Sequence, residues 1–377
     1  MTNGVSKLKE TLASCRRVTV CLDGWSKKGL TASFLGISAC FFDPTSNKSQ
    51  HAFLGLERLQ HPHTGEMLST CLERSLTNWG IPQDKVMLIV SDNGANMVKA
   101  VRLLQERVQL EQEQSGDLQS DSEDELDTSH EEGFTDDDVD GDHGGPVDLI
   151  VNDIPYRRMG CLAHTLQLVI KQAYNGNEFK DLLVKTHNLV RKVRKSSVAM
   201  EKIMSKCGKS VIGDNATRWN STYIMAKRLI EIKIPMEEAI ARLGIDSLLT
   251  SEWGHLEELV SLLEPFATHT DTLQSDCLSL SYIIPSILDL EAHLEQFQTV
   301  KPLTTAMLID IRRRFQTFLQ PDCPDFNPLG AAACLLDPTC ATVILGFDQS
   351  TLRDAAKMYI LTQVNECEPI IYSQHTL

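Results

Sequence analysis

The sequence lacks several features that mark membrane, secreted and zinc-finger proteins. It has no run of 18 or more apolar residues, which excludes an obvious transmembrane helix. Its first twenty residues lack the apolar core of a secretory signal. The 11 cysteines are scattered singly, without a CxxC pair. This scatter indicates a reducing compartment and argues against disulfides or a free-standing zinc finger, so we expect no membrane partner and no zinc.

The chain also has little net charge once one segment is set aside. Its 377 residues are 42% apolar and 23% charged, as in ordinary globular proteins, and the net charge is −15. Residues 105–148 contain 17 acids and one base, a local charge of −16, which leaves +1 for the rest. The acidity of the whole chain is therefore a poor guide to its partners.

The acidic segment itself, residues 106–148, is poor in apolar residues and rich in serine and glycine. Such a segment cannot bury enough surface to offset its chain entropy, so we predict a disordered loop. It could be an acidic interaction tract, a phosphorylation target at Ser120 and Ser122, or a solvated spacer.

Hydrophobic periodicity predicts strands first and helices later. A continuous apolar run at 85–90 is typical of a strand buried on both faces. The first hundred residues therefore predict a mixed α/β domain with a three-layer core. The expected strands are 17–22, 30–42, 51–56 and 85–90, with helices at 64–79 and 96–110. Further helices are expected at 162–173, 179–193, 221–232, 236–243, 253–268, 282–297, 304–318 and 351–362, and a strand or short buried segment at 331–337.

Two carboxylates follow or end predicted strands. Asp23 ends the first strand and precedes Gly24, and Asp92 ends the buried strand and precedes Asn93. Carboxylates at strand ends of one sheet could bind Mg²⁺ or Mn²⁺ for two-metal phosphoryl transfer. Asp-Gly and Asp-Asn-Gly also form ordinary turns, so the spacing leaves both readings open.

Cys161 and His164 lie three residues apart at the start of a predicted helix. They would share one helix face and could touch each other or share a metal. A zinc site needs four ligands and no second pair of this kind exists, so the alternative is a packed cysteine beside a hydrogen-bonded histidine.

A basic stretch follows within the helical region. Residues 191–229 contain ten Lys or Arg against two acids, which is typical of a phosphate-contacting surface. Trp219 could stack on an unpaired base, or it could pack down at a helix start that Asn220 or Ser221 caps. The candidate DNA contacts are Arg191, Lys192, Arg194, Lys195, Arg218 and Trp219.

Seven motifs in order resemble those of hAT-type transposases, above all the vertebrate BED-zinc-finger proteins descended from them. They run over nearly the whole chain. The motifs are DGWS at Asp23, HTGE at His63, SDNGANM at Ser91, CLAH at Cys161, RWNSTY at Arg218, LLEPF at Leu262 and AAACLLDP at Ala331.

The resemblance implies an RNase H-like core, of α/β class, interrupted by a large helical insertion. Asp23 and Asp92 would be the first two acids of a DDE triad, Cys161 and His164 a structural CxxH pair, and Trp219 a residue that stacks on a flipped base. The expected parts are the core at 1–105, the acidic loop at 106–148, the core again at 149–175, the helical insertion at 176–322 and a truncated return to the core at 323–377.

The sequence also departs from the family. Its third acid, a Glu beyond the LDP motif, is expected to be absent, because Glu366 and Glu368 stand in a dissimilar context. The BED finger and the dimerisation segment are also expected to be missing. We therefore expect a domesticated or truncated nuclear protein that binds DNA and chromatin or transcription proteins without completing transposition. The alternatives are an active DDE recombinase, with Mg²⁺ or Mn²⁺ and a third acid outside this chain, and a protein-interaction scaffold.

Overall fold

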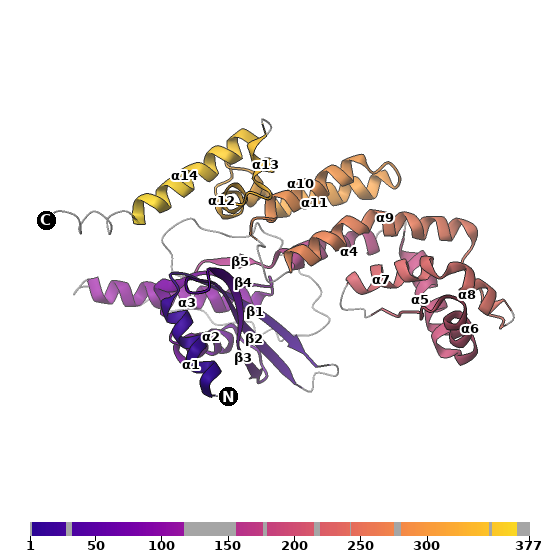
Figure 1. Ribbon diagram of the computed structural model, residues 1–377, viewed down its shortest axis with the longest axis horizontal. Coiled ribbons are helices and arrows are strands. Elements are labelled where there is room, and N and C mark those ends of the chain that lie inside the picture. The colour runs from indigo at the N-terminus through magenta and orange to yellow at the C-terminus, as the bar shows by residue number, and fades with distance from the viewer. Residues whose placement is uncertain are drawn as a thin grey trace, which may run out of the picture.

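A five-stranded mixed sheet organises the N-terminal part of the chain, and helices form most of the rest (Figure 1). The computed structural model describes residues 2–27, 32–116, 156–175, 179–214, 219–241, 243–274, 280–346 and 349–367. Its strands are β1 (Val18–Ser26), β2 (Ser33–Asp43), β3 (Lys48–Leu59), β4 (Val86–Ser91) and β5 (Arg158–Gly160).

The strand order is β3-β2-β1-β4-β5. Strands β1–β3 are antiparallel neighbours, whereas β4 runs parallel to β1 and β5 parallel to β4. The sheet with its flanking helices confirms the predicted α/β class. The parallel strands matter for function, because their carboxyl ends meet at one edge of the sheet.

Helices α1 (Thr2–Ser14), α2 (Gly65–Trp79) and α3 (Ala95–Gly116) cover one face of the sheet (Figure 1). Val20, Ile37 and Ile89 project into this core and are fully buried. The other side of β4 places Leu88 in the core of the helical region, which confirms that this strand is buried on both faces. A short 3-10 turn, Gln83–Lys85, leads into β4.

The HTGE motif forms the start of α2. Thr64 is the N-cap, and its hydroxyl accepts a hydrogen bond from the Met67 amide at 3.3 Å. His63 is 1% exposed, its ring is 4.1 Å from that of His61, and burial lowers the pKa of its imidazole. The helix ends at Gly80, whose φ of 67° is the left-handed conformation that favours glycine.

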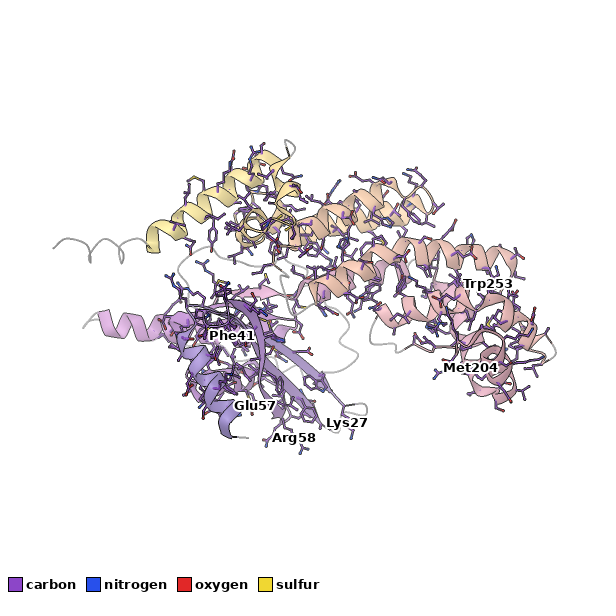
Figure 2. The ribbon with its side chains drawn as sticks, viewed as in Figure 1. Lys27, Phe41, Glu57, Arg58, Met204 and Trp253 are labelled. Atoms are coloured by element: carbon purple, nitrogen blue, oxygen red, sulfur yellow. The ribbon has the colours of Figure 1, made fainter. Side chains whose placement is uncertain are left out.

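The remaining helices form a long, largely separate body (Figure 1). Trp253, in the first turn of α9, is buried near one end of this body (Figure 2); it is 1% exposed, and its indole N–H donates to Glu237 Oε1 at 2.9 Å. The helices are α4 (Leu162–Asn175), α5 (Lys180–Lys195), α6 (Ser197–Cys207), α7 (Trp219–Glu231), α8 (Lys233–Ile240), α9 (Thr250–Leu273), α10 (Ile283–Gln296), α11 (Lys301–Leu319), α12 (Leu329–Leu336), α13 (Ala341–Leu345) and α14 (Ser350–Cys367).

Two sequence predictions need correction. Residues 331–337 were expected to form a strand or short buried segment, but α12 is a helix, since its Ala-rich sequence favours helix and Ala331 and Cys334 pack against neighbouring helices. Helix α3 continues to Gly116, so residues 106–116 of the predicted acidic loop are helical. The rest of that loop, with Ser120 and Ser122, lies outside the described residues.

The AAACLLDP motif joins α12 to the start of α10 through Asp337. Its carboxylate accepts hydrogen bonds from the Ser281 hydroxyl at 2.7 Å and from the Thr339 hydroxyl at 2.7 Å. The Thr339 and Ser281 hydroxyls lower the pKa of Asp337 to about 2. These bonds favour the ionised carboxylate in the folded state.

Replacing Asp337 by Asn should make the chain less stable, with a pH dependence of known sign. A lowered folded-state pKa stabilises the fold above the unfolded pKa of about 3.9, and this stabilisation is lost as the pH falls through about 2. Urea unfolding of both proteins between pH 6 and pH 2 should therefore give curves that converge at the acid end. A difference that stays constant across that range would contradict the assignment.

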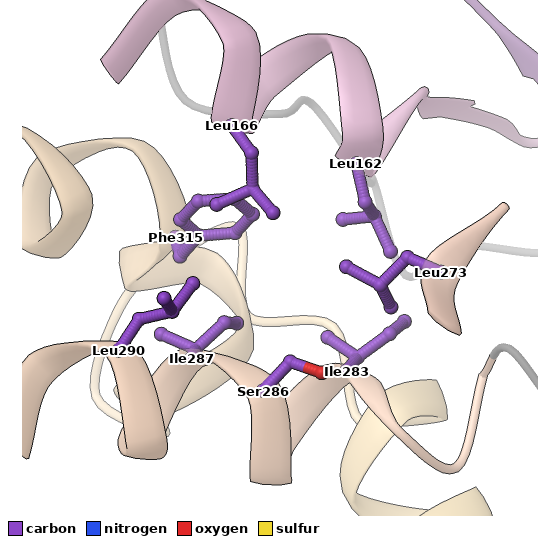
Figure 3. Close-up of a pocket in the computed structure, with 8 residues that line it drawn as sticks. All are labelled: Leu162, Leu166, Leu273, Ile283, Ser286, Ile287, Leu290 and Phe315. Carbon is purple, nitrogen blue, oxygen red and sulfur yellow. The ribbon is translucent and has the colours of Figure 1, made fainter. Parts of the chain in front are cut away.

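An apolar gap lies where α4, α9, α10 and α11 meet (Figure 3). It has no room for a water-sized molecule, and its lining residues are Leu162, Leu166, Leu273, Ile283, Ser286, Ile287, Leu290 and Phe315. No charged group lines it, so the gap is a packing feature between helices and offers no reactive side chain beyond the Ser286 hydroxyl.

The side chains of Ser286, His269 and Asp289 contact one another in the same order as the Ser, His and Asp of a hydrolytic triad. Ser286 Oγ is 3.1 Å from His269 Nδ1, and His269 Nε2 is 2.7 Å from Asp289 Oδ2. Ser286 is 1% exposed in the first turn of α10. A nucleophile needs access to substrate, so we interpret this set as a polar tether between α9 and α10.

Candidate functional site

Asp23 and Asp92 lie just beyond the last parallel pair of β1 and β4. The prediction that Asp23 ends its strand is wrong, because β1 continues through Asp23 to Ser26 in its pairing with β2. In the register of β1 and β4, Cys21 pairs with Val90. Asp23 and Asp92 each lie two residues after this pair, on neighbouring segments of the sheet. In the register of β4 and β5, Ser91 pairs with Gly160, which brings Cys161 beside Asp92. The fold therefore places both carboxylates and the Cys161 thiol in one row.

The thiol of Cys161 interacts electrostatically with both carboxylates. Burial raises the pKa of the Cys161 thiol above its ordinary value, and the negative charges of Asp92 and Asp23 raise it further. Asp23 is exposed and Asp92 is half-buried. The edge is thus an open patch of negative charge, the electrostatic setting in which a divalent cation binds.

The turn that carries Asp92 is fixed by residues that sequence reasoning did not single out. Arg158, on β5, donates from Nε to Ser91 Oγ at 3.0 Å and from Nη2 to Asn93 Oδ1 at 2.8 Å and to the Asp92 carbonyl. The Gly94 amide donates to Asp92 Oδ1 at 3.1 Å. Arg158 therefore fixes the backbone of the turn, whereas the Gly94 amide within the turn orients the Asp92 carboxylate.

The absence of a side chain at Gly160 lets Asn93 of this turn pack against β5. A Cβ on Gly160 would lie 2.5 Å from Asn93 Oδ1, and the neighbouring Cys161 amide donates to the Ser91 carbonyl at 2.6 Å. The glycine directly before the CLAH motif was the available sequence signal. Cys161 thus links β4 to the start of α4, while a structural role for Cys161 and His164 stays a prediction.

Replacing Gly160 by Ala should lower the free energy of unfolding by about 1–3 kcal/mol, the range for disturbing a hydrogen bond to a charged group. The new methyl group would push Asn93 away from Arg158. Gly254→Ala is the matched control, because nothing lies within 4 Å of its added Cβ in α9 and alanine favours helix. Urea unfolding measures the stability of both variants. If Gly160→Ala is as stable as Gly254→Ala, Gly160 is not needed for the contact between Asn93 and Arg158.

Asp23 and Asp92 are the hard oxygen donors that could bind Mg²⁺ or Mn²⁺ here. Within the described ranges, no group of three or more His, Cys, Asp or Glu side chains is arranged to hold a metal ion. Glu368 lies outside the described residues, as does the Glu366 side chain. A metal at this edge therefore stays a prediction.

The structure contradicts the prediction that Trp219 is an exposed stacking platform. Trp219 opens α7 but is 7% exposed within the core of the helical region. The Tyr174 hydroxyl donates to the Trp219 carbonyl at 3.0 Å, and the indole packs at 6.4 Å from the ring of Tyr223. A side chain this buried offers little surface to a base, so Trp219 packs down. Arg218 lies outside the described residues.

The four basic residues at the end of α5, which we call the α5 cluster, are exposed. They are Arg191, Lys192, Arg194 and Lys195. Among the described residues none of them forms an ion pair, whereas most cations of the neighbouring helices do. Those pairs are Lys206–Glu238, Lys209–Glu231, Arg228–Glu231, Lys227–Glu264 and Lys233–Glu257.

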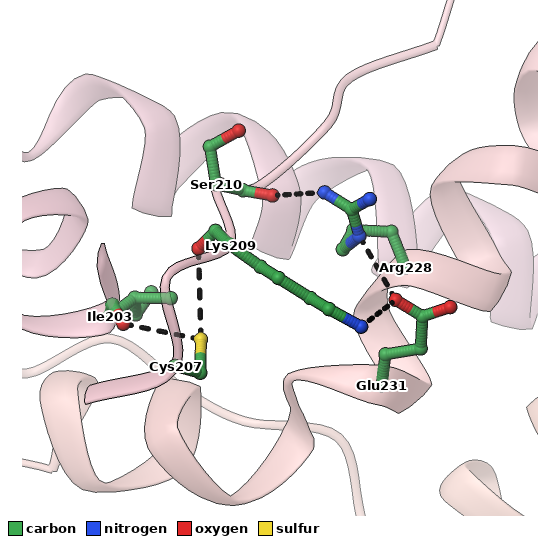
Figure 4. A network of polar contacts seen from close by, with 6 residues as sticks. All are labelled: Ile203, Cys207, Lys209, Ser210, Arg228 and Glu231. Carbon is green, nitrogen blue, oxygen red and sulfur yellow. Dashed lines mark hydrogen bonds and ion pairs between the residues drawn. The ribbon is translucent and has the colours of Figure 1, made fainter. Parts of the chain in front are cut away.

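The segment between α6 and α7 is tethered beside the α5 cluster. Arg228 donates to the Ser210 carbonyl at 3.1 Å and bridges Glu231, which also binds Lys209 (Figure 4). Further along, Asp214 accepts hydrogen bonds from His187 at 2.6 Å and from Thr222 at 3.2 Å. This tethering holds the start of the RWNSTY region close to the end of α5.

Gly213 lies directly against Arg194. A Cβ added at Gly213 would collide with the Arg194 guanidinium, so the absence of a side chain lets the arginine lie across the backbone. The segment between α6 and α7 thus passes over the last turn of α5 at Arg194, one of the four residues of the α5 cluster.

Comparison with known proteins identifies related domains. Two family models match, described as “ZBED1 RNase-like domain” over residues 21–119 and “ZBED1 RNase-like helical domain” over residues 159–262. The first begins within β1 and covers β2–β4 with α2 and α3, and the second begins within β5 and continues through the helices to α9. Together they span more than half of the chain.

Two curated relatives also align. “Putative transcriptional regulator tpeD” of Talaromyces stipitatus is 24% identical over 321 residues, 77% of this chain and 33% of that protein. “Zinc finger BED domain-containing protein 4” of Homo sapiens is 23% identical over 197 residues, 50% of this chain and 17% of that protein. The chain thus spans about a third and about a sixth of their lengths. With its RNase-like sheet domain and its matching helical domain, the chain belongs to the ZBED-like proteins derived from hAT transposases.

Proposed function

We propose that this chain is a domesticated hAT-derived protein that binds DNA in the nucleus and regulates transcription without completing transposition. The observation that supports DNA binding is the exposed α5 cluster, whose four cations have no ion-pair partner among the described residues. Unpaired cations can neutralise phosphates at no cost in broken ion pairs. The relative named as a transcriptional regulator supports a regulatory role.

The edge with Asp23 and Asp92 supplies the residues for metal binding, but we propose that it does not cleave DNA here. If Mg²⁺ binds, these two carboxylates would hold it and it would polarise a phosphate oxygen. Two-metal catalysis needs further donors, and within the described ranges no cluster of three acids or imidazoles provides them. Among the described helices, none combines the length and hydropathy that a bilayer crossing requires.

One assay tests both halves of the proposal. The chain is titrated with a fluorescent 30-base-pair duplex at salt concentrations from 50 to 200 mM, and the same duplex is then incubated with Mg²⁺ or Mn²⁺. We expect binding that weakens steeply with salt, and no nicked product. Metal-dependent nicking that disappears in Asp92→Asn would make the chain an active DDE recombinase. The absence of salt-dependent binding would instead favour a protein-interaction scaffold.

A further inference from the structure

Strands β1–β3 have a second face that no described helix covers. The helices that lie against β2 and β3 are α1 and α2, and they pack on the face that carries Leu35 and Ile37. Residues on the opposite face follow from the register. Trp25 pairs with Phe34 and then Arg58, and the next row is Asp23, Gly36 and Leu56.

Large apolar side chains are exposed on this open face. Trp25 is 43% exposed, Phe53 64% and Leu56 49%. Trp25 stacks on Phe34 with a centroid distance of 5.9 Å, and a Cβ on Gly36 would lie 3.0 Å from the indole. The indole therefore lies along the sheet surface beside Phe34, supported by Gly36 below, while much of the ring stays accessible.

Two cations adjoin the aromatic row. Lys27 follows β1 and Arg58 is in register with Phe34, and both lie at the tip of the sheet (Figure 2). Neither forms an ion pair within the described ranges, whereas the neighbouring Glu57 is bound to Arg74 at 2.5 Å. In the next row, Asp23 continues this face into the edge that carries Asp92.

We propose that this open face binds an unpaired stretch of nucleic acid, with Trp25 and Phe53 stacking on bases and Lys27 and Arg58 contacting phosphates. The proposal rests on the DNA binding proposed above and names the form of DNA that this part of the molecule takes. Aromatic rings stack on any base, since every base has a π face, and unpaired cations follow the backbone. A sheet surface with exposed aromatics is also how some RNA-binding domains hold single strands.

A protein partner is the competing occupant, because exposed apolar patches often mark protein interfaces. Two observations favour nucleic acid. Arg58 stands in the same row as Trp25 and Phe34, with Lys27 next to it at the tip of the sheet, and the face continues into the edge that carries Asp23 and Asp92.

Tryptophan fluorescence gives a direct measurement. Trp25 is the exposed one of the four tryptophans, since Trp79 is half-buried, Trp219 is 7% exposed and Trp253 is 1% exposed. The intact chain is titrated with single-stranded dT12 and with a duplex hairpin of similar charge. We expect dT12 to quench the emission and Trp25→Ala to abolish that quenching. The affinity of Trp25→Ala or Phe53→Ala, measured by the anisotropy of dye-labelled dT12, should fall between about 5-fold and about 150-fold, with little change for the duplex.

Ile234→Ala is the matched control, because Ile234 is 69% exposed but lies on α8. Thermal melts confirm that each variant is folded. Unchanged dT12 affinity in Trp25→Ala, while duplex binding stays salt-dependent, would overturn this inference and leave the proposed function standing. If the wild type binds neither DNA, both fail. If Trp25→Ala and Phe53→Ala change only the mass measured by light scattering, the face is an interface between copies of the chain, and the nucleic-acid reading is wrong.

Discussion

Replacing Trp219 by alanine is expected to lower the free energy of unfolding by about 3–5 kcal/mol, the range for truncating a buried tryptophan. The ring is 7% exposed and belongs to the core of the helical region, at the point where α7 begins. Its loss would leave a cavity beside Tyr223, and the surrounding helices could close it only in part. Urea unfolding followed by circular dichroism measures the change.

Trp25→Ala is the internal comparison for this prediction. Trp25 is 43% exposed on the open sheet face, so its truncation should change stability by less than about 1 kcal/mol. The two variants should therefore differ in what they lose. Trp219→Ala should lose stability and keep its preference among DNA forms, whereas Trp25→Ala should keep its stability and lose affinity for unpaired DNA. A stable Trp219→Ala variant that selectively loses affinity for DNA with unpaired bases would restore the stacking hypothesis.

Most of the fold follows from local pattern. The unbroken apolar run in β4 predicts a strand buried on both faces, and the structure confirms it. The strand β5 was missed because it has three residues and its apolar content is a single Met159. Helix α12 was misjudged because a short apolar run carries no periodicity, and its alanines, which favour helix, were the better guide.

The two carboxylates of the candidate site could be predicted from the sequence, but the residues that position them could not. Asp23 and Asp92 follow β-strand patterns directly, and parallel strands bring their ends together. Arg158 and Gly160 act across 65 or more residues of sequence, through contacts with Asn93 that no local pattern encodes. Whether Trp219 faces solvent or core was undetermined for the same reason, since both roles suit an aromatic at a helix start.

Neutralising the α5 cluster should have the second large effect. In the variant with Arg191, Lys192, Arg194 and Lys195 all replaced by Gln, four exposed cations without an ion-pair partner among the described residues are removed. If each meets one phosphate, the slope of log affinity against log salt should become shallower by about 3.6, because each contact contributes about 0.9. Between 50 and 200 mM salt, the wild type would then lose about 100-fold more affinity than the variant.

A second fourfold variant provides the control, with Lys206, Lys209, Lys227 and Lys233 replaced by Gln. These lysines are ion-paired with Glu238, Glu231, Glu264 and Glu257, so the change in net charge is identical while the partners differ. Paired cations are already partly neutralised and should contribute little to the slope. A long-range field alone would make the two variants alike, since it depends on net charge. Equal slopes would therefore show that the α5 cluster makes no direct contact with phosphate, whereas a change confined to the α5 variant places the DNA on the last turns of α5.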